Sequence, residues 1–171
     1  MTQQQPLNPI EQAKIAKETA IDQWIPRKKE LAKEFIQDEA KQKARNLVKG
    51  SVHLCELGEN IGSEQSEERP VIIVSNDRIN STSTNVKIIP LSKTLKTKQV
   101  VNRKKRTITV PKVKTHFFLM KSKYKFLTYD SAAMAEGITT VSKVRLGKHL
   151  GSVDPDDLEK IMSRLKWVFD F

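Results

Sequence analysis

One arginine marks the place in this sequence where chemistry on a phosphate is most easily built. Arg69 follows a polar segment of about a dozen residues, 58–68, and directly precedes the apolar run Pro70–Val74. Such a run is typical of a buried strand, so a long loop should deliver the arginine to the mouth of that strand. A guanidinium held there can bind a phosphate through parallel hydrogen bonds. The alternative is a structural arginine paired with Glu67 or Glu68.

The rest of the sequence shows no motif of a general catalytic mechanism. It has no glycine-rich phosphate loop, no nucleophile elbow and no HExxH zinc motif. Cys55 is the only cysteine, which excludes an internal disulfide and a cysteine-rich zinc site, and we expect it to be a small core residue. Because histidines occur only at positions 53, 116 and 149, we expect no metal site and no cofactor.

The charge of the chain indicates a polyanionic partner. Its 171 residues include 31 Lys and Arg against 20 Asp and Glu, a net charge of +11. The 52 residues between Asp77 and Asp130 contain 14 of these bases and no acid. We interpret this stretch as a phosphate-facing surface, with a lysine-protected strand edge as the alternative for residues 93–106. No apolar run is long enough to span a membrane and no signal peptide is visible, so we expect a cytoplasmic protein without a membrane partner.

From residue 50 onward the hydrophobic pattern favours a small barrel or sandwich of short strands. Candidate strands cover residues 51–57, 70–74, 86–91, 107–110, 116–120, 131–135 and 138–141. Ser142 is expected to cap a short helix that runs through Leu150 and stops at Gly151. A last helix should begin at Asp154-Pro155 and carry an apolar stripe that covers one face of the barrel.

Residues 1–49 form a separate helical segment ahead of a barrel domain at residues 50–171. Asn8 and Pro9 have the form of a helix start, and this helix is expected to end or kink at Pro26. A second helix should then run towards the end of the segment. Its apolar stripe is narrow, so this helix is expected to pack on something rather than to stand alone.

The N-terminal segment is expected to pack on the barrel or on a partner subunit, because its large apolar side chains would otherwise be exposed. These side chains are Ile21, Trp24, Ile25, Leu31 and Phe35. An alternative is that residues 27–29, all basic, extend the phosphate-facing surface. A fused inhibitor of a basic site should be acidic, whereas this segment has a net charge of +3.

Short motifs follow one another in a familiar order along residues 50–171. They are Gly62-Ser63-Glu64-Gln65, Arg69-Pro70-Val71-Ile72-Ile73-Val74-Ser75-Asn76, Ile89-Pro90-Leu91-Ser92, Asp130-Ser131, Glu136-Gly137-Ile138, Ser142-Lys143-Val144-Arg145-Leu146 and a final Phe169-Asp170-Phe171. In this order they resemble the MazF/PemK family of toxin endoribonucleases. The resemblance implies a mainly β fold, a small SH3-like barrel with a C-terminal helix, to which this chain adds an N-terminal helical extension.

The resemblance also implies an activity. Such a protein would be the homodimeric toxin of a type II toxin-antitoxin system, held by an antitoxin, that cleaves single-stranded RNA without a metal. The RNA's own 2′-hydroxyl attacks and leaves 2′,3′-cyclic phosphate and 5′-hydroxyl ends. Arg69 matches the catalytic arginine, which would neutralise charge on the phosphorane oxygens. Ser92 stands where many members have threonine, and its hydroxyl would donate to a phosphate oxygen or orient the 2′-hydroxyl.

The residues expected to bind RNA come from several parts of the chain. They are Gly62, Ser63, Glu64, Gln65, Asn76, Arg103, Lys104, Lys105, Arg106, His116 and Tyr124. Tyr124 lies among lysines and is expected, with Phe126, to stack on bases. For His116 a structural role is the alternative. Trp24 and Trp167 are assigned to core or interface packing.

Two features depart from the family pattern. Glu136-Gly137-Ile138-Thr139 stands where many members have Glu-Gln-Ile-Arg, and the segment from Lys93 to Lys114 is longer and more basic. The missing amide and arginine favour an alternative function, a nuclease-inactive nucleic-acid-binding or regulatory module on the same fold. A third possibility is a protein-targeting poison, like the gyrase-inhibiting toxins of this fold.

Overall fold

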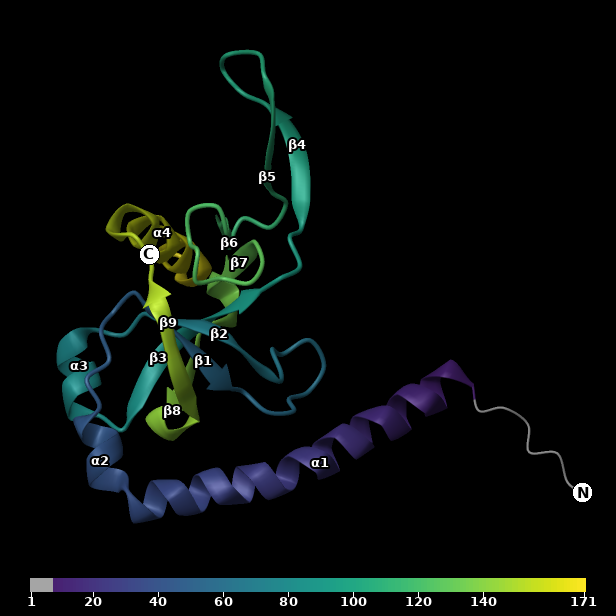
Figure 1. Cartoon of the computed structure of the whole chain (residues 1–171). Helices are drawn as coiled ribbons and strands as arrows, with labels where there is room; N and C mark the ends of the chain where they lie inside the picture. Colours follow the sequence, from purple (N-terminus) through teal and green to yellow (C-terminus); the bar gives the residue numbers. More distant parts are fainter. Residues whose placement is uncertain (1–7) are drawn as a thin grey trace, which may run out of the picture.

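The computed structural model describes residues 8–171, which form a curved antiparallel sheet with helices near both ends of the chain (Figure 1). The strands are β1 (Ser51–Glu56), β2 (Glu68–Ile73), β3 (Asn85–Ser92), β4 (Thr97–Val101), β5 (Thr107–Pro111), β6 (His116–Leu119), β7 (Ser131–Met134), β8 (Thr139–Ser142) and β9 (Leu146–Ser152). The helices are α1 (Pro9–Gln37), α2 (Glu39–Ala44), α3 (Asp77–Thr82) and α4 (Pro155–Phe169), with single 3-10 turns η1 (Ala135–Gly137) and η2 (Lys143–Arg145).

The long strand β3 organises the sheet. Six strands follow the order β6-β7-β3-β2-β1-β9, and β8 pairs with the first half of β3. The last two residues of β3 pair with β7 instead, so the sheet turns there and wraps around its core. The apolar runs of β2 and β3 are buried on both faces, as their continuous hydrophobic sequence predicts. The expected small barrel of short strands is therefore present.

Two apolar clusters fill the faces of this sheet. The first lies between the sheet and α4, where Ile72 and Ile89 pack with Ile161 and Leu165 of the helix. The second includes Cys55, which is fully buried and confirms the expected core role of this cysteine. Burial raises the pKa of its thiol to about 12, so Cys55 stays a neutral core side chain.

The C-terminal helix starts as its sequence predicts. Asp154 caps α4 by accepting a hydrogen bond from the backbone N–H of Asp156 at 3.0 Å, and Pro155 takes the first helical position. The helix expected from Ser142 to Leu150 is wrong. Ser142 ends β8, and residues 143–150 form η2 and most of β9, because β9 pairs with β1 and that pairing outweighs the local helical pattern.

Strands β4 and β5 form a hairpin of their own. Among the described strands they pair only with each other, in register from Thr97 opposite Pro111 to Val101 opposite Thr107. Figure 1 shows this hairpin standing away from the barrel, and most of its side chains are exposed. The extra length noted between residues 93 and 114 is thus a protruding two-stranded arm.

Helix α1 continues through Pro26, so the expectation that it ends there is wrong; Figure 1 shows one bowed ribbon. Asn8 caps its start, as expected, by accepting from the N–H of Glu11 at 2.9 Å. Pro26 is exposed, and the residues on either side of it, Trp24 and Arg27, contact the barrel. Pro26 has no N–H to donate to the preceding turn, but these contacts hold the helix on both sides of it, and the helix bends to accommodate the proline ring.

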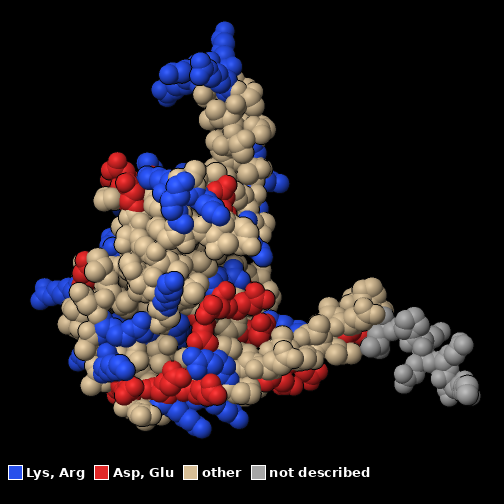
Figure 2. Space-filling view, viewed as in Figure 1, with Lys and Arg blue, Asp and Glu red and all other residues tan. Residues whose placement is uncertain are grey.

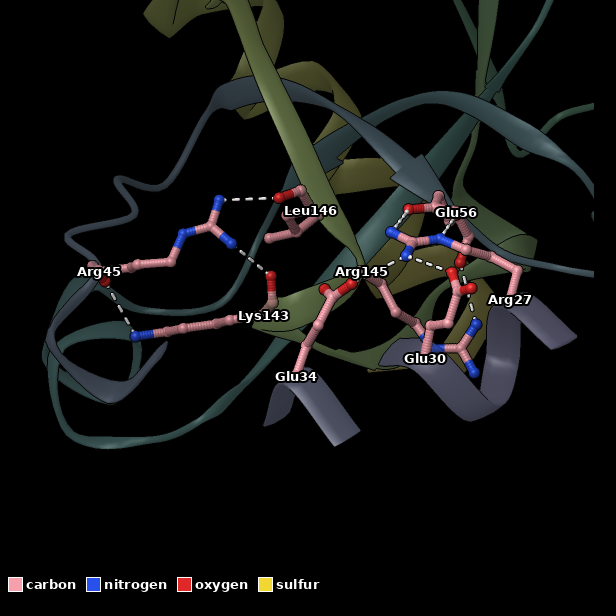
Figure 3. A network of polar contacts seen from close by, with 8 residues as sticks. All are labelled: Arg27, Glu30, Glu34, Arg45, Glu56, Lys143, Arg145 and Leu146. Carbon is pink, nitrogen blue, oxygen red and sulfur yellow. Dashed lines mark hydrogen bonds and ion pairs between the residues drawn. The ribbon is translucent and has the colours of Figure 1, made fainter. Parts of the chain in front are cut away.

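After α1, the expected second helix is reduced to the short α2. The segment that follows α2 is attached to the barrel by hydrogen bonds in both directions between Arg45 and Lys143 (Figure 3). The ammonium of Lys143 is fully buried and donates to the carbonyls of Lys43, Arg45 and Asn80 at 2.9, 2.9 and 2.6 Å. In return, Arg45 donates to the carbonyls of Lys143 and Leu146 at 2.6 and 2.8 Å. Burial lowers the pKa of Lys143.

The N-terminal segment packs on the barrel through only part of the apolar set that was expected to do so. Leu31 is buried and Trp24 and Phe35 are half-buried, whereas Ile21 and Ile25 remain exposed. Trp167 is also largely exposed, so it is not a core residue of the single chain, and interface packing stays a prediction for it. Over residues 8–171, none of the helices has the length and apolar character needed to cross a membrane.

Candidate active site

Arg69 and Ser92 come from neighbouring strands and line the same pocket. The β2–β3 pairing ends where Val71 lies opposite Pro90, and Arg69 and Ser92 each lie two residues beyond this pair on their own strands. Ser92 also pairs with Ala132 of β7, so the pocket opens where β3 passes from one neighbour to the next. The structure therefore brings together the two residues expected to be catalytic, in a cavity of about 510 Å³.

The wall of this pocket is apolar on one part and polar on the rest. Its apolar residues are Leu54, Pro70, Leu91 and Leu127. Its polar residues besides Arg69 and Ser92 are Gln65, Glu67, Glu68, Lys93, Thr94, Thr128, Tyr129 and Ser131. A concave site with an apolar wall and a few convergent polar groups suits a ligand with a charged group and a flat ring. Among the residues that the structure describes, no cluster of His, Cys, Asp or Glu could hold a metal ion.

The guanidinium of Arg69 is held by the loop that precedes it. Its Nε donates to the carbonyl of Ser66 at 2.8 Å, and Nη1 donates to the side-chain oxygen of Gln65. Arg69 forms no ion pair within residues 8–171, so the alternative of a structural pair with Glu67 or Glu68 is wrong. Nη2 keeps its N–H groups for a ligand.

The hydroxyl of Ser92 is arranged to donate. Its oxygen accepts a hydrogen bond from the backbone N–H of Thr94 at 3.2 Å, and the side chain is half-buried in the pocket wall. An accepted bond leaves the hydroxyl proton free to point at a ligand oxygen. Arg69 and Ser92 can therefore both donate to an oxyanion bound between them.

Tyr129 is a candidate that the sequence reasoning missed. It lines the pocket, 60% of its surface is exposed, and the ammonium of Lys93 lies 6.0 Å from its ring centroid. An exposed ring beside a cation can stack on a base while the lysine meets a phosphate. The available signal was its position directly before the motif Asp130-Ser131, at the end of the acid-free stretch.

The loop between β1 and β2 carries four of the residues expected to bind RNA. Only Gln65 lines the pocket. Gly62, Ser63 and Glu64 are exposed at the turn of the same loop, where Gly62 has a positive φ of 62° that favours glycine. Glu64 stabilises the turn by accepting from the N–H of Ile61 at 3.2 Å. These three residues can reach only a ligand that extends beyond the pocket.

Asn76 lies away from the pocket. It follows the far end of β2 and caps α3, where its side chain accepts from the N–H of Arg78 at 2.8 Å. This is an ordinary capping role. The structure thus gives Asn76 a structural function and does not bring it to Arg69.

Arg103, Lys104, Lys105 and Arg106 occupy the tip of the β4–β5 hairpin. All four are exposed, and Figure 2 shows the basic side chains gathered at this tip with no acidic side chain beside them in that view. Lys105 has a positive φ of 55°, and Asn102 accepts from the N–H groups of Lys104 and Arg106 at 3.0 Å. The turn is therefore built to display cations away from the barrel.

The structure buries both His116 and Tyr124. His116 has its Nε2 2.7 Å from Glu136 Oε1, in agreement with the structural alternative. Tyr124 is 4% exposed, donates to Asp157 Oδ2 at 2.7 Å and packs edge-on against Phe126, so the prediction that it stacks on a base is wrong. Burial and the bond to Asp157 raise its pKa.

The departure at Gly137 is explained by packing. A Cβ added there would lie 3.0 Å from Pro90 Cγ, so a larger residue at this position requires the Pro90 ring to move slightly. Neither Gly137 nor Thr139 lines the pocket that contains Arg69. Their difference from the family pattern leaves the pocket itself complete.

Comparison with known proteins decides the family. Residues 48–169 match the family described as PemK-like, MazF-like toxin of type II toxin-antitoxin system. The chain belongs to this family. Endoribonuclease MazF of Staphylococcus saprophyticus is 32% identical over 115 residues, which span 67% of this chain and 84% of that relative. The first 47 residues lie outside the family match.

Solved structures show the same fold. MazF from Deinococcus radiodurans matches with a TM-score of 0.58 and 14% identity, over 74% of this chain and 99% of that one. A mycobacterial endoribonuclease solved in complex with its cognate antitoxin matches with a TM-score of 0.54 and 24% identity, over 73% and 96% of the chains. The predicted mainly β, MazF-type fold with a C-terminal helix and an N-terminal helical extension is confirmed.

Proposed function

We propose that this MazF-like toxin is an endoribonuclease that cleaves single-stranded RNA at the pocket between β2 and β3, without a metal ion. The observation that carries the proposal is the meeting of Arg69 and Ser92 in one cavity, each with a donor left for an oxyanion. Family membership supports the reaction class, and the geometry supports the assignment of these residues.

The proposed reaction is transesterification within the RNA. The 2′-oxygen forms a bond to phosphorus, and the bond from phosphorus to the 5′-oxygen breaks. The 2′-hydroxyl loses its proton, and the 5′-oxygen gains one. The products are a 2′,3′-cyclic phosphate and a 5′-hydroxyl. Negative charge grows on the non-bridging oxygens, where Arg69 and Ser92 stabilise it by hydrogen bonds that strengthen in the transition state.

The surroundings of the pocket support a single-stranded substrate. The exposed ring of Tyr129 can stack on a base only if that base is already unpaired. Lys93 beside it and the four cations at the hairpin tip provide phosphate contacts along a strand that leaves the pocket. Gln65 lines the pocket, and its side chain can bind a base edge while its oxygen accepts from Arg69.

The partners in this proposal are a cognate antitoxin and a second copy of the chain, in the cytoplasm. Arg69 and Lys93 in the pocket, together with the four cations at the hairpin tip, are suited to an acidic antitoxin segment that competes with RNA. One solved relative was captured with its cognate antitoxin, which supports the first partner. The mass of the purified protein in solution tests the second.

The test is to incubate the purified protein with mixed-sequence RNA in EDTA and to map the cuts and their ends. The proposal predicts cuts with 5′-hydroxyl ends that persist in EDTA. Binding without cutting would favour the nuclease-inactive module instead. A complex with topoisomerase and intact RNA would favour the protein-targeting poison.

A further inference from the structure

Helix α1, which lies outside the family match, contacts the loop that carries Arg69. The ammonium of Lys17 lies 2.6 Å from Glu59 Oε2. The ring of Trp24 covers Gly58 so closely that an added Cβ would lie 2.3 Å from it, and Gly58 has a positive φ of 82°. A residue with a side chain at position 58 would thus prevent the helix from docking.

The foot of this loop is held by a second set of contacts (Figure 3). Arg27 of α1 donates to both carboxylate oxygens of Glu56, at 2.9 and 2.7 Å, in a bidentate pair. This pairing lowers the pKa of Glu56. Arg145 donates to the carbonyls of Glu56 and Leu57 at 2.9 and 3.2 Å, and its guanidinium lies 5.9 Å from the Trp24 ring centroid. Helix α1, η2 and the loop therefore meet at one junction.

Hydrogen bonds continue from this junction to the catalytic arginine. Gly58 accepts from the N–H of Glu67 at 2.7 Å. Next to Glu59, the side chain of Asn60 donates to the carbonyl of Gln65 at 2.7 Å, and its N–H donates to Ser66 Oγ at 3.1 Å. Gln65 and Ser66 are the two residues that accept from Arg69. Lys17 is thus connected to the guanidinium of Arg69 through its ion pair with Glu59 and the hydrogen bonds of the adjacent Asn60.

We propose that α1 is a positioning element for the active site: Lys17 and Trp24 fix the β1–β2 loop in the conformation that aims Arg69 into the pocket. The inference rests on the proposed function, because it assigns to Arg69 the role given above. Most of this loop between Gly58 and Arg69 is polar, and five of residues 57–67 are exposed. A loop of this kind loses considerable conformational entropy when it is fixed, and the helix contacts oppose that loss.

The test compares full-length variants of the ion pair with a matched control on the same helix. Lys17→Ala, Glu59→Ala and the double variant remove the pair, and Lys17→Arg keeps it. Lys14→Ala is the control, because within residues 8–171 Lys14 pairs only with Glu11 of the same helix, 2.8 Å away. The measurements are kcat and KM for RNA cleavage, the melting temperature, and amide hydrogen exchange of residues 57–67.

A partly exposed ion pair changes an equilibrium by about two- to five-fold. Each single alanine variant should therefore lower kcat by about two- to five-fold with KM unchanged, and speed exchange across residues 57–67. The double variant should lose no more than either single variant, since the pair acts as a unit. Lys17→Arg and Lys14→Ala should match the wild type.

Unchanged kcat and unchanged exchange in Lys17→Ala would overturn the inference. So would a raised KM with kcat intact, because Lys17 would then act as an RNA contact. If the wild-type protein cuts no RNA, the proposed function fails, and the exchange rates decide the inference separately. Faster exchange at residues 57–67 would still support the positioning of the loop by α1, and unchanged exchange would overturn it.

Discussion

At the scale of single residues, the site depends on donors that the fold leaves unused. Ser92 accepts one hydrogen bond from Thr94 and keeps its own proton for the pocket. Arg69 binds the loop through Nε and Nη1, which leaves the N–H groups of Nη2 for a ligand. Neither arrangement needs a metal or a nucleophilic side chain, because in the proposed reaction the RNA supplies its own nucleophile. Positioning and charge stabilisation then carry the rate.

The first prediction concerns the hydroxyl of Ser92. Ser92→Ala should slow RNA cleavage by about ten-fold, the value of one neutral hydrogen bond of roughly 1.4 kcal/mol. Ser92→Thr keeps the donor and should cleave at the wild-type rate or faster, since a threonine rotamer is more restricted. Initial rates on one RNA give the comparison, with the exposed Ser122→Ala as control. Cleavage by Ser92→Ala at the wild-type rate would remove the hydroxyl from the mechanism.

A second prediction concerns Asp157, which joins α4 to the segment after β6. It accepts from Lys123, Tyr124 and Lys160 at 2.8, 2.7 and 2.9 Å. Burial alone would raise its pKa, but these hydrogen bonds outweigh burial and hold the pKa at about 2. The folded-state pKa is thus below the unfolded value of about 3.9, so the carboxylate stabilises the fold above pH 4 and loses this effect as the pH falls through 2.

Asp157→Asn should therefore lower the free energy of unfolding by about 2 kcal/mol at pH 7. The difference from wild type should shrink as the pH falls from 4 to 2, because the wild-type carboxylate becomes protonated over this range. Urea denaturation at pH 7 and pH 2.5 measures both values, and Asp156→Asn is an exposed control on the same helical turn. An equal difference at both pH values would contradict the assignment of the stabilisation to ionised Asp157.

Residue types and spacing predicted some of these roles and misled on others. Arg69 could be found because a polar loop and a buried strand meet there, and Ser92 because a family motif ends there. Tyr124 has lysines on both sides in sequence, which suggested an exposed ring. Its partner Asp157 lies 33 residues further on, and no local pattern reveals such a contact. Tyr129, which lies between Thr128 and Asp130, is the exposed one.

At the scale of elements, the β4–β5 hairpin is the part of the barrel domain that is least supported by packing. A free two-stranded hairpin is only marginally stable in water, so a partner should order it further. Its tip carries four cations. Residues 78–129 contain no Asp or Glu, so no carboxylate close in sequence offsets this positive charge. These features fit a flexible arm that follows a phosphate backbone.

The third prediction is the salt dependence of RNA binding. With four to six phosphate contacts, a plot of log affinity against log salt should have a slope of roughly −3 to −4 on single strands. Changing Arg103, Lys104, Lys105 and Arg106 to Gln should make the slope shallower by about 1.5 to 3. The matched control changes Lys28, Lys29, Lys33 and Lys41, four exposed lysines of the N-terminal helices, to Gln. An equal change of slope in both variants would mean that the hairpin tip makes no specific contribution.

Local patterns predicted the beginnings of helices better than their ends. Asn8 and Asp154 both cap as their sequences predict, because a cap depends only on the next three residues. Pro26 does not end α1, since tertiary contacts hold the helix on both sides of it. Residues 146–150 have a helical pattern but pair with β1. In both cases a contact distant in sequence decided the outcome.

At the scale of the whole molecule, the described residues form a MazF-type barrel and a helical extension that contacts it at several places, among them the ion pair of Lys17 with Glu59. Arg45 and Lys143 exchange hydrogen bonds at another place, and Arg27 and Glu56 pair at a third. The family resemblance predicted the barrel and its C-terminal helix but said nothing of the extension, which lies outside it. Composition alone predicted only that the extension should pack, and it does so through fewer apolar contacts and more ion pairs than expected.

The fourth prediction tests this attachment. Deleting residues 1–46 removes buried Leu31 and the hydrogen bonds of Arg45, and should lower the free energy of unfolding by roughly 2–3 kcal/mol. For a chain of this size the melting temperature should fall by about 5–10 °C. RNA cleavage should not become faster. A truncated protein that cuts faster than the full chain would show that the helices cover the site.

The central claim is that the pocket of Arg69 cuts RNA, and the most direct test compares two arginine variants. Arg69→Ala leaves the barrel folded, because the side chain lies at a strand mouth, while Arg78→Ala removes an exposed arginine beyond the far end of the same strand. The measurement is the rate at which 5′-hydroxyl ends appear in EDTA. Arg69→Ala should be slower by about 10²–10³-fold, the effect of losing one oxyanion donor, and Arg78→Ala should match the wild type. A folded Arg69→Ala that cuts at the wild-type rate would contradict the account.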